Sequence, residues 1–179
     1  MEVFLKKIAE QYDGTVQVNE STWYNGHAYM PLFIYTLEFN EDNLKVKFKY
    51  EFRKSEFENS TSIDGGTFGD RHIFEFTANN SEKEFPSFIV EDVNIFKRIL
   101  LKNKLPFQIK CKSKEFSNML LNNHNLKEMM SFVSIDSEFS PNIYGKTEKD
   151  IYNLKILFLT KKVQYNLLEH SFKFLTMFK

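Results

Sequence analysis

Asp70, Arg71 and His72 place a carboxylate, a permanent cation and a titratable ring in three consecutive positions of the chain. Successive residues of a strand point to opposite faces, so Asp70 and His72 would share one side and Arg71 would take the other. An acidic residue beside a histidine is a pair that can orient a general base. The sequence supplies no neighbouring nucleophile or metal ligand, and polar residues at the start of a strand explain the triplet equally well. We therefore treat the three residues as a candidate binding site.

The triplet lies within the only glycine-dense stretch of the chain, STSIDGGTFGDRHIFEF at residues 60–76, directly after the three glycines. A phosphate-binding loop of the Walker type needs Gly-Lys-Ser/Thr at the start of a helix, and a dinucleotide fingerprint needs three glycines between a strand and a helix. Here the glycines lead into IFEF at 73–76, which is typical of a strand. We predict a long connection between two strands, with a ligand-binding loop as the alternative.

Residues that could bind a metal or act as a nucleophile are scattered. His27, His72, His124 and His170 form no HExxH motif and no local pair, and Cys111 is the single cysteine. One cysteine excludes an internal disulfide and a multi-cysteine zinc site, and in an alternating segment it is expected to be a small core residue. No G-x-S-x-G motif is present. We predict no metal and no cofactor, and we favour a binding role over an enzymatic one.

A basic ribbon is the best-defined surface feature of the sequence. Lys45, Lys47, Lys49 and Arg53 alternate with apolar residues, so strand geometry places all four on one face. In RNA-binding sheets the aromatic residues share the exposed face, whereas here they alternate onto the opposite, buried face. The pattern indicates a solvated outer face, with an acidic protein partner as the alternative.

Composition limits the class of protein. The chain has 179 residues, 24 basic and 24 acidic, with a pI near 6.9, which argues against nucleic acid or an anionic membrane as the main partner. The length fits a single globular domain over residues 1–179. The N-terminal stretch lacks the pattern of a signal peptide, and no apolar run approaches the roughly 20 residues of a membrane helix. We expect a soluble, cytoplasmic protein. Its 20 phenylalanines indicate either an A+T-rich genome or an aromatic cavity.

Hydrophobic periodicity predicts the elements that would position these residues. In the first half a helix over 2–12, ended by Asp13-Gly14, precedes a meander of strands around Asn25-Gly26 and over 32–39, 44–53 and 73–76, with Pro31 at a strand start or bulge. In the second half we predict three helices: one over 92–104 capped by Asp92, one from Ser113 to about 122 stopped by NNHN at 122–125, and a last one over 162–178. Between them we predict strands over 107–111, 131–135 and 151–160, with a connection or short strand over 139–145.

These elements predict an α+β fold with a mostly antiparallel sheet of about six to eight strands and three to four helices packed largely on one face. The apolar arc of the last helix, which includes Leu167, Phe174 and Phe178, exceeds half its circumference. Either the helix over 92–104 covers the surplus, or two copies form a homodimer through residues 163–178.

The predicted function is that of an intracellular binding or interaction module with an unidentified protein partner, for which a protein-neutralising, immunity-type role is one concrete form. The alternative is a small-molecule-binding protein, or a hydrolase or transferase, with a site near residues 60–72.

Overall fold

One eight-stranded sheet organises the molecule, and all its neighbouring strands are antiparallel. The computed structural model describes residues 1–26, 28–55, 70–93, 105–136 and 138–179. The strands, in their spatial order across the sheet, are β1 (Thr15–Tyr24), β2 (Tyr29–Glu41), β3 (Leu44–Arg53), β4 (Arg71–Asn80), β8 (Ile151–Thr160), β7 (Asn142–Glu148), β5 (Phe88–Asp92) and β6 (Phe107–Cys111).

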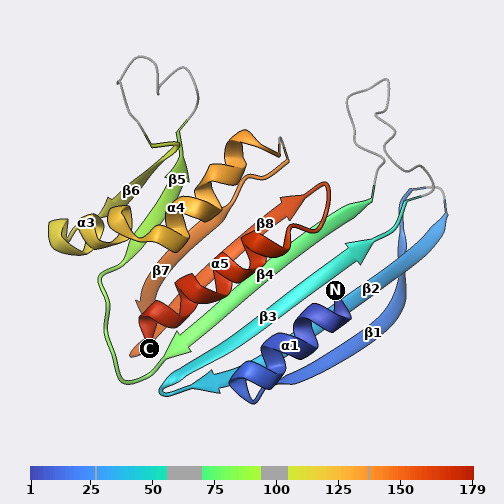
Figure 1. Ribbon diagram of the computed structural model, residues 1–179, viewed down its shortest axis with the longest axis horizontal. Coiled ribbons are helices and arrows are strands. Elements are labelled where there is room, and N and C mark those ends of the chain that lie inside the picture. The colour runs from blue at the N-terminus through green and yellow to red at the C-terminus, as the bar shows by residue number, and fades with distance from the viewer. Residues whose placement is uncertain (27, 56–69, 94–104, 137) are drawn as a thin grey trace.

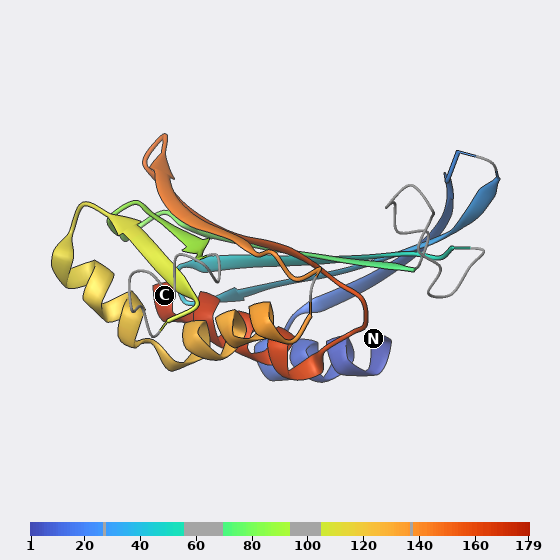
Figure 2. The same ribbon diagram turned by 90° about the horizontal axis from the view of Figure 1, so that it is seen from above.

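The helices of the described residues cover one face of this sheet, as Figures 1 and 2 show. They are α1 (Glu2–Tyr12), α3 (Lys114–Asn122), α4 (His124–Ser131) and α5 (Tyr165–Leu175). The 3-10 turn η1 (Phe132–Ser134) follows α4, and η2 (Thr176–Phe178) follows α5. No described element covers the opposite side, which we call the open face. The predicted α+β fold is confirmed, including the placement of the helices on one side.

The first half of the chain follows its sequence pattern closely. The helix over 2–12 and the strand over 44–53 are confirmed, and Asp13 ends α1 in the left-handed conformation with φ of 51°. β2 and β4 are longer than predicted. Pro31 neither starts a strand nor forms a bulge, because it is the third residue of β2 and lies opposite Thr22. The position tolerates proline because regular pairing of β2 with β3 ends at Leu32.

The second half departs from the prediction in two places. Asp92, expected to cap a helix, is the last residue of β5, and the rest of the predicted helix, residues 94–104, lies outside the described residues. The predicted strand over 131–135 is wrong, since Ser131 ends α4 and the chain continues into η1. The reason is Asn123: its side chain accepts a hydrogen bond from the N–H of Leu126, so it starts α4 in the segment predicted as a stop. Ser113 caps α3 as predicted.

Aromatic residues fill the layer between the helices and the sheet. Phe172 of α5 contacts three sheet phenylalanines, Phe39, Phe48 and Phe76, with ring centroids 5.0 to 6.2 Å apart. The apolar arc of the last helix is buried within the chain, because Leu167, Phe172, Phe174 and Phe178 are at most 1% exposed. The face that suggested a homodimer through residues 163–178 is therefore occupied by this chain's own sheet and by α4.

Candidate functional site

His72 lies on the helix-covered side of β4, packed among aromatic rings. Its ring stacks on Phe52 with centroids 4.9 Å apart, and its Nδ1 is 2.8 Å from the hydroxyl oxygen of Tyr50. Burial lowers the pKa of His72, and the nearby charge of Asp70 only partly opposes that shift. Burial also raises the pKa of the Tyr50 phenol. Near neutral pH the two side chains therefore form an uncharged, hydrogen-bonded pair.

Asp70 and Arg71 make different contacts from His72. Asp70 accepts a hydrogen bond from the backbone N–H of Ser55 at 2.8 Å, which ties the start of β4 to the residues that follow β3. Arg71 is exposed and lies opposite Arg53 of β3, on the other face from His72. Arg71 and His72 thus take opposite faces of β4, whereas Asp70 precedes the strand. The glycine stretch beside the triplet falls in residues 56–69, outside the described residues, so a site near 60–72 stays a prediction.

The basic ribbon of β3 points to the open face, where Lys47, Lys49 and Arg53 are paired and the exposed Lys45 has no ion pair with a described residue. Lys47 pairs with Glu38 at 2.7 Å, and Lys49 pairs with Glu51 at 2.6 Å. Burial opposes ionisation of Glu51, but the hydrogen bonds from Lys49 and Arg53 outweigh it and lower the pKa of the carboxyl group. The pairs around Glu51 lie along β3 and are partly buried, whereas Glu38 and Lys47 form an exposed pair between β2 and β3 that is worth roughly 0 to 1 kcal/mol.

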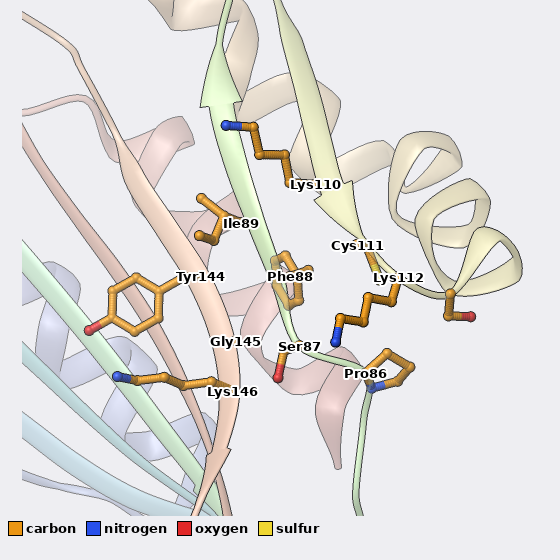
Figure 3. A pocket seen from close by; sticks show the side chains of 11 residues that line it. Pro86, Ser87, Phe88, Ile89, Lys110, Cys111, Lys112, Tyr144, Gly145 and Lys146 are labelled. Atoms are coloured by element: carbon orange, nitrogen blue, oxygen red, sulfur yellow. The ribbon is translucent and has the colours of Figure 1, made fainter.

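A groove of about 770 Å³ hollows the open face at the other end of the sheet, where β7, β5 and β6 lie side by side (Figure 3). Its apolar floor is Ile89 of β5, which is 46% exposed. Pairing places Tyr144 of β7 on one side of Ile89 and Lys110 of β6 on the other. The six side chains that give the groove its chemistry are Ser87, Ile89, Lys110, Lys112, Tyr144 and Lys146.

Lysines stand on both banks of this groove. Lys146 belongs to the β7 bank, where its Nζ lies 5.5 Å from the centre of the Tyr144 ring and 2.7 Å from Glu148. On the β6 bank Lys110 pairs with Glu91 at 2.6 Å. Lys112, further along the same bank, is exposed and has no ion pair with any described residue. The groove therefore combines an apolar floor with a cation that no described residue neutralises.

Gly145 allows β7 to lie close to the aromatic side chains beneath it. The residue lies between Tyr144 and Lys146, and its missing side chain leaves room beneath the strand for the rings of Phe88 and Tyr152. A Cβ atom at this position would meet the Tyr152 hydroxyl and would lie 2.6 Å from Cε1 of Phe88. No other residue type fits here without moving one of those rings.

None of the groove residues was predicted as a site. The segment 139–145 was predicted only as a connection or short strand, and β5 was not predicted. The alternation of buried Phe88 and Val90 with outward Ile89 and Glu91 was the available signal for β5. This alternation covers only four residues, and the aspartate that follows it, Asp92, is also a typical N-cap of a helix.

In the described part of the chain, no helix is both long and apolar enough to cross a bilayer. Among the same residues no three His, Cys, Asp or Glu side chains come together as metal ligands. Comparison of the chain with known protein families, with curated protein sequences and with solved structures gives no match.

Proposed function

We propose that this protein is a cytoplasmic binding module that docks an acidic segment of another protein in the groove between β6 and β7. The observation that carries the proposal is the arrangement of lysines on both banks, Lys110 and Lys112 opposite Lys146, around the exposed Ile89. An apolar floor favours one apolar side chain of the ligand, and the banks favour carboxylates on either side of it.

The shape of the groove favours an extended segment over a compact molecule. The groove follows β5, with one strand on each side, and it is open to solvent along the open face (Figure 3). Alternate side chains of an extended peptide point the same way, so every second residue of a ligand lying along β5 would face the floor and the banks. Acidic residues at those positions would reach Lys112 directly and would compete with Glu91 and Glu148 for Lys110 and Lys146.

The charge pattern also supports this end of the open face over the basic ribbon. On the ribbon Lys47 and Lys49 already pair with Glu38 and Glu51. Lys45 has no ion pair with a described residue, but its cross-strand neighbours are Asn40 and Asn79, so it lacks the apolar neighbour that Ile89 provides in the groove. Lys112 has no such competitor among the described residues. The single cysteine, Cys111, can form no internal disulfide, which is compatible with a reducing cytoplasm. Docking of this kind is what a protein that neutralises another protein by covering it would require.

A peptide-binding measurement tests the proposal. The probe is a labelled synthetic peptide in which glutamates alternate with serines around one central phenylalanine, so that the glutamates and the phenylalanine share one side. Fluorescence anisotropy should show binding that weakens as the salt concentration rises from about 0.02 to 0.3 M, because exposed charge pairs are screened. A scrambled peptide with adjacent glutamates serves as the reference ligand.

The matched variants are K112E/K146E in the groove and K45E/K47E in the ribbon, which change the net charge by the same amount. The groove variant should lose binding at least tenfold, and the ribbon variant should bind like the wild type. Equal loss in both variants would show non-specific attraction and overturn the proposal. Retained binding in K112E/K146E would overturn it as well.

A further inference from the structure

We infer that two copies of this chain pair through β1, edge to edge, to form one continuous antiparallel sheet. β1 is the first strand in the order of the sheet, and β2 is its only strand neighbour among the described residues. It is ten residues long. Its outer edge therefore offers a row of backbone N–H and C=O groups long enough to take another strand.

β1 lacks the features that keep edge strands from pairing. Natural edge strands are protected by lysines, prolines, bulges or short length. The sequence TVQVNESTWY contains no lysine and no proline, and Glu20 is its only charged residue. Pairing with β2 continues from Thr15 to Tyr24 without a bulge. The other edge of the sheet differs, since β6 has five residues and carries Lys110.

A second copy is the occupant that this strand fits, and the sequence selects the register. In an antiparallel pair, residues directly opposite each other point to the same face of the sheet. When the two strands are identical and related by a two-fold axis, this condition is met only if one residue lies on the axis, opposite its own copy. An axis at Asn19 or at Glu20 pairs the most residues of β1. An axis at Glu20 would set two carboxylates against each other, whereas an axis at Asn19 sets Glu20 opposite Val18. The inferred dimer therefore has Asn19 opposite the same residue of the second copy.

This dimer is independent of the proposed groove. β1 and β6 are at opposite ends of the strand order, so edge pairing leaves the groove of each copy free at the far ends of the joined sheet (Figure 1). It also replaces the dimer predicted through residues 163–178, whose apolar side chains are buried in the chain. Two grooves on one rigid sheet would bind a partner with repeated acidic segments more tightly than one groove.

Sedimentation velocity tests the pairing. The wild type at about 100 μM should sediment with twice the monomer mass of 21.3 kDa. In N19K/S21K two exposed positions of β1 become positively charged, and the lysines at the axis would repel, so this variant should sediment as a monomer with an unchanged circular dichroism spectrum. The control N40K/N79K carries the same added charge at exposed positions of β2 and β4 and should remain dimeric.

A cross-linking experiment tests the register. In a C111S background, N19C should form an intermolecular disulfide on mild oxidation, because directly opposite Cβ atoms lie about 4.5–5.5 Å apart. Q17C should not, because its inferred neighbour is Ser21. A monomeric wild type would overturn the inference and leave the edge for a strand of a different protein. A dimer that persists in N19K/S21K, or cross-links of Q17C without cross-links of N19C, would overturn it too.

Discussion

The ring of Phe172 in α5 meets the ring of Phe76 in β4 edge to face, with centroids 5.0 Å apart and planes inclined at 74°. The same phenylalanine touches Phe39 and Phe48, so one side chain of the last helix contacts three adjacent strands. This contact fixes the helix layer over the middle of the sheet. The helix is therefore part of the core rather than an attachment to it.

Phe172→Ala should lower the free energy of unfolding by about 3–5 kcal/mol, because the substitution leaves a cavity that the surrounding aromatic rings cannot move to fill. Lys173→Ala removes the neighbouring exposed side chain and should change stability by less than about 0.5 kcal/mol. Urea unfolding followed by circular dichroism measures both values. A loss below about 1 kcal/mol in Phe172→Ala would contradict the packing described above.

Acidification should destabilise the protein through His72. Burial lowers the pKa of His72 below its ordinary value of 6.5, so the unfolded chain takes up a proton at a pH where the folded chain does not. The contribution of His72 is complete above pH 6.5 and is lost as the pH falls from there toward the folded pKa. The free energy of unfolding of the wild type should fall between pH 7.5 and 5.5, and that of His72→Gln should fall less. Identical slopes in the two proteins would contradict this assignment.

Tyr50→Phe isolates the hydrogen bond within that pair. The substitution removes only the hydroxyl group 2.8 Å from His72 Nδ1, and it should cost about 0.5–1.5 kcal/mol. His72 then loses the hydrogen bond to Tyr50, while its ring stacking on Phe52 remains. A double-mutant cycle with His72→Gln should show coupling between the two substitutions. Additive effects of the two substitutions would mean that the hydrogen bond between Tyr50 and His72 contributes nothing to stability.

Gly145→Ala should lower the free energy of unfolding by about 1–3 kcal/mol, since the added methyl group overlaps Tyr152 and Phe88. Tyr152→Leu shortens one of the two obstacles. The double variant Gly145→Ala/Tyr152→Leu should therefore be more stable than the sum of the single effects predicts. Thermal unfolding of the four proteins gives this comparison, and a Gly145→Ala protein as stable as the wild type would disprove the role of the glycine.

Local sequence signals were sufficient for the elements with long, regular patterns. The strict alternation from Leu44 to Arg53 predicted β3 with its exposed lysines, and the apolar run at 156–159 predicted the central position of β8. Asn123 shows where such signals fail, because an asparagine after a helix can end that helix and can also begin the next one. The chain does both there.

The groove could not be predicted from local signals because its parts come together only through long-range pairing. Phe88 pairs with Cys111 on one side and with Gly145 on the other. Each of these residues has an ordinary explanation in its own segment: a core phenylalanine, a small cysteine in an alternating strand and a glycine in a short strand or connection. Their common function as the frame of a groove appears only when the three strands are placed side by side. The candidate residues that the sequence did single out lie on β3, on β4 and directly before β4, away from that groove.

The most direct test of the docking groove is a methyl NMR titration of isoleucine-labelled protein with the alternating glutamate peptide. Ile89 lies on the floor of the groove, and Ile34 and Ile73 lie on the open face of β2 and β4, so the three methyl groups report on different parts of one surface. Binding in the groove predicts a saturable shift of the Ile89 resonance with Ile34 and Ile73 unchanged. Shifts of Ile73 or Ile34 without a shift of Ile89, or no shift at any of them, would contradict the account.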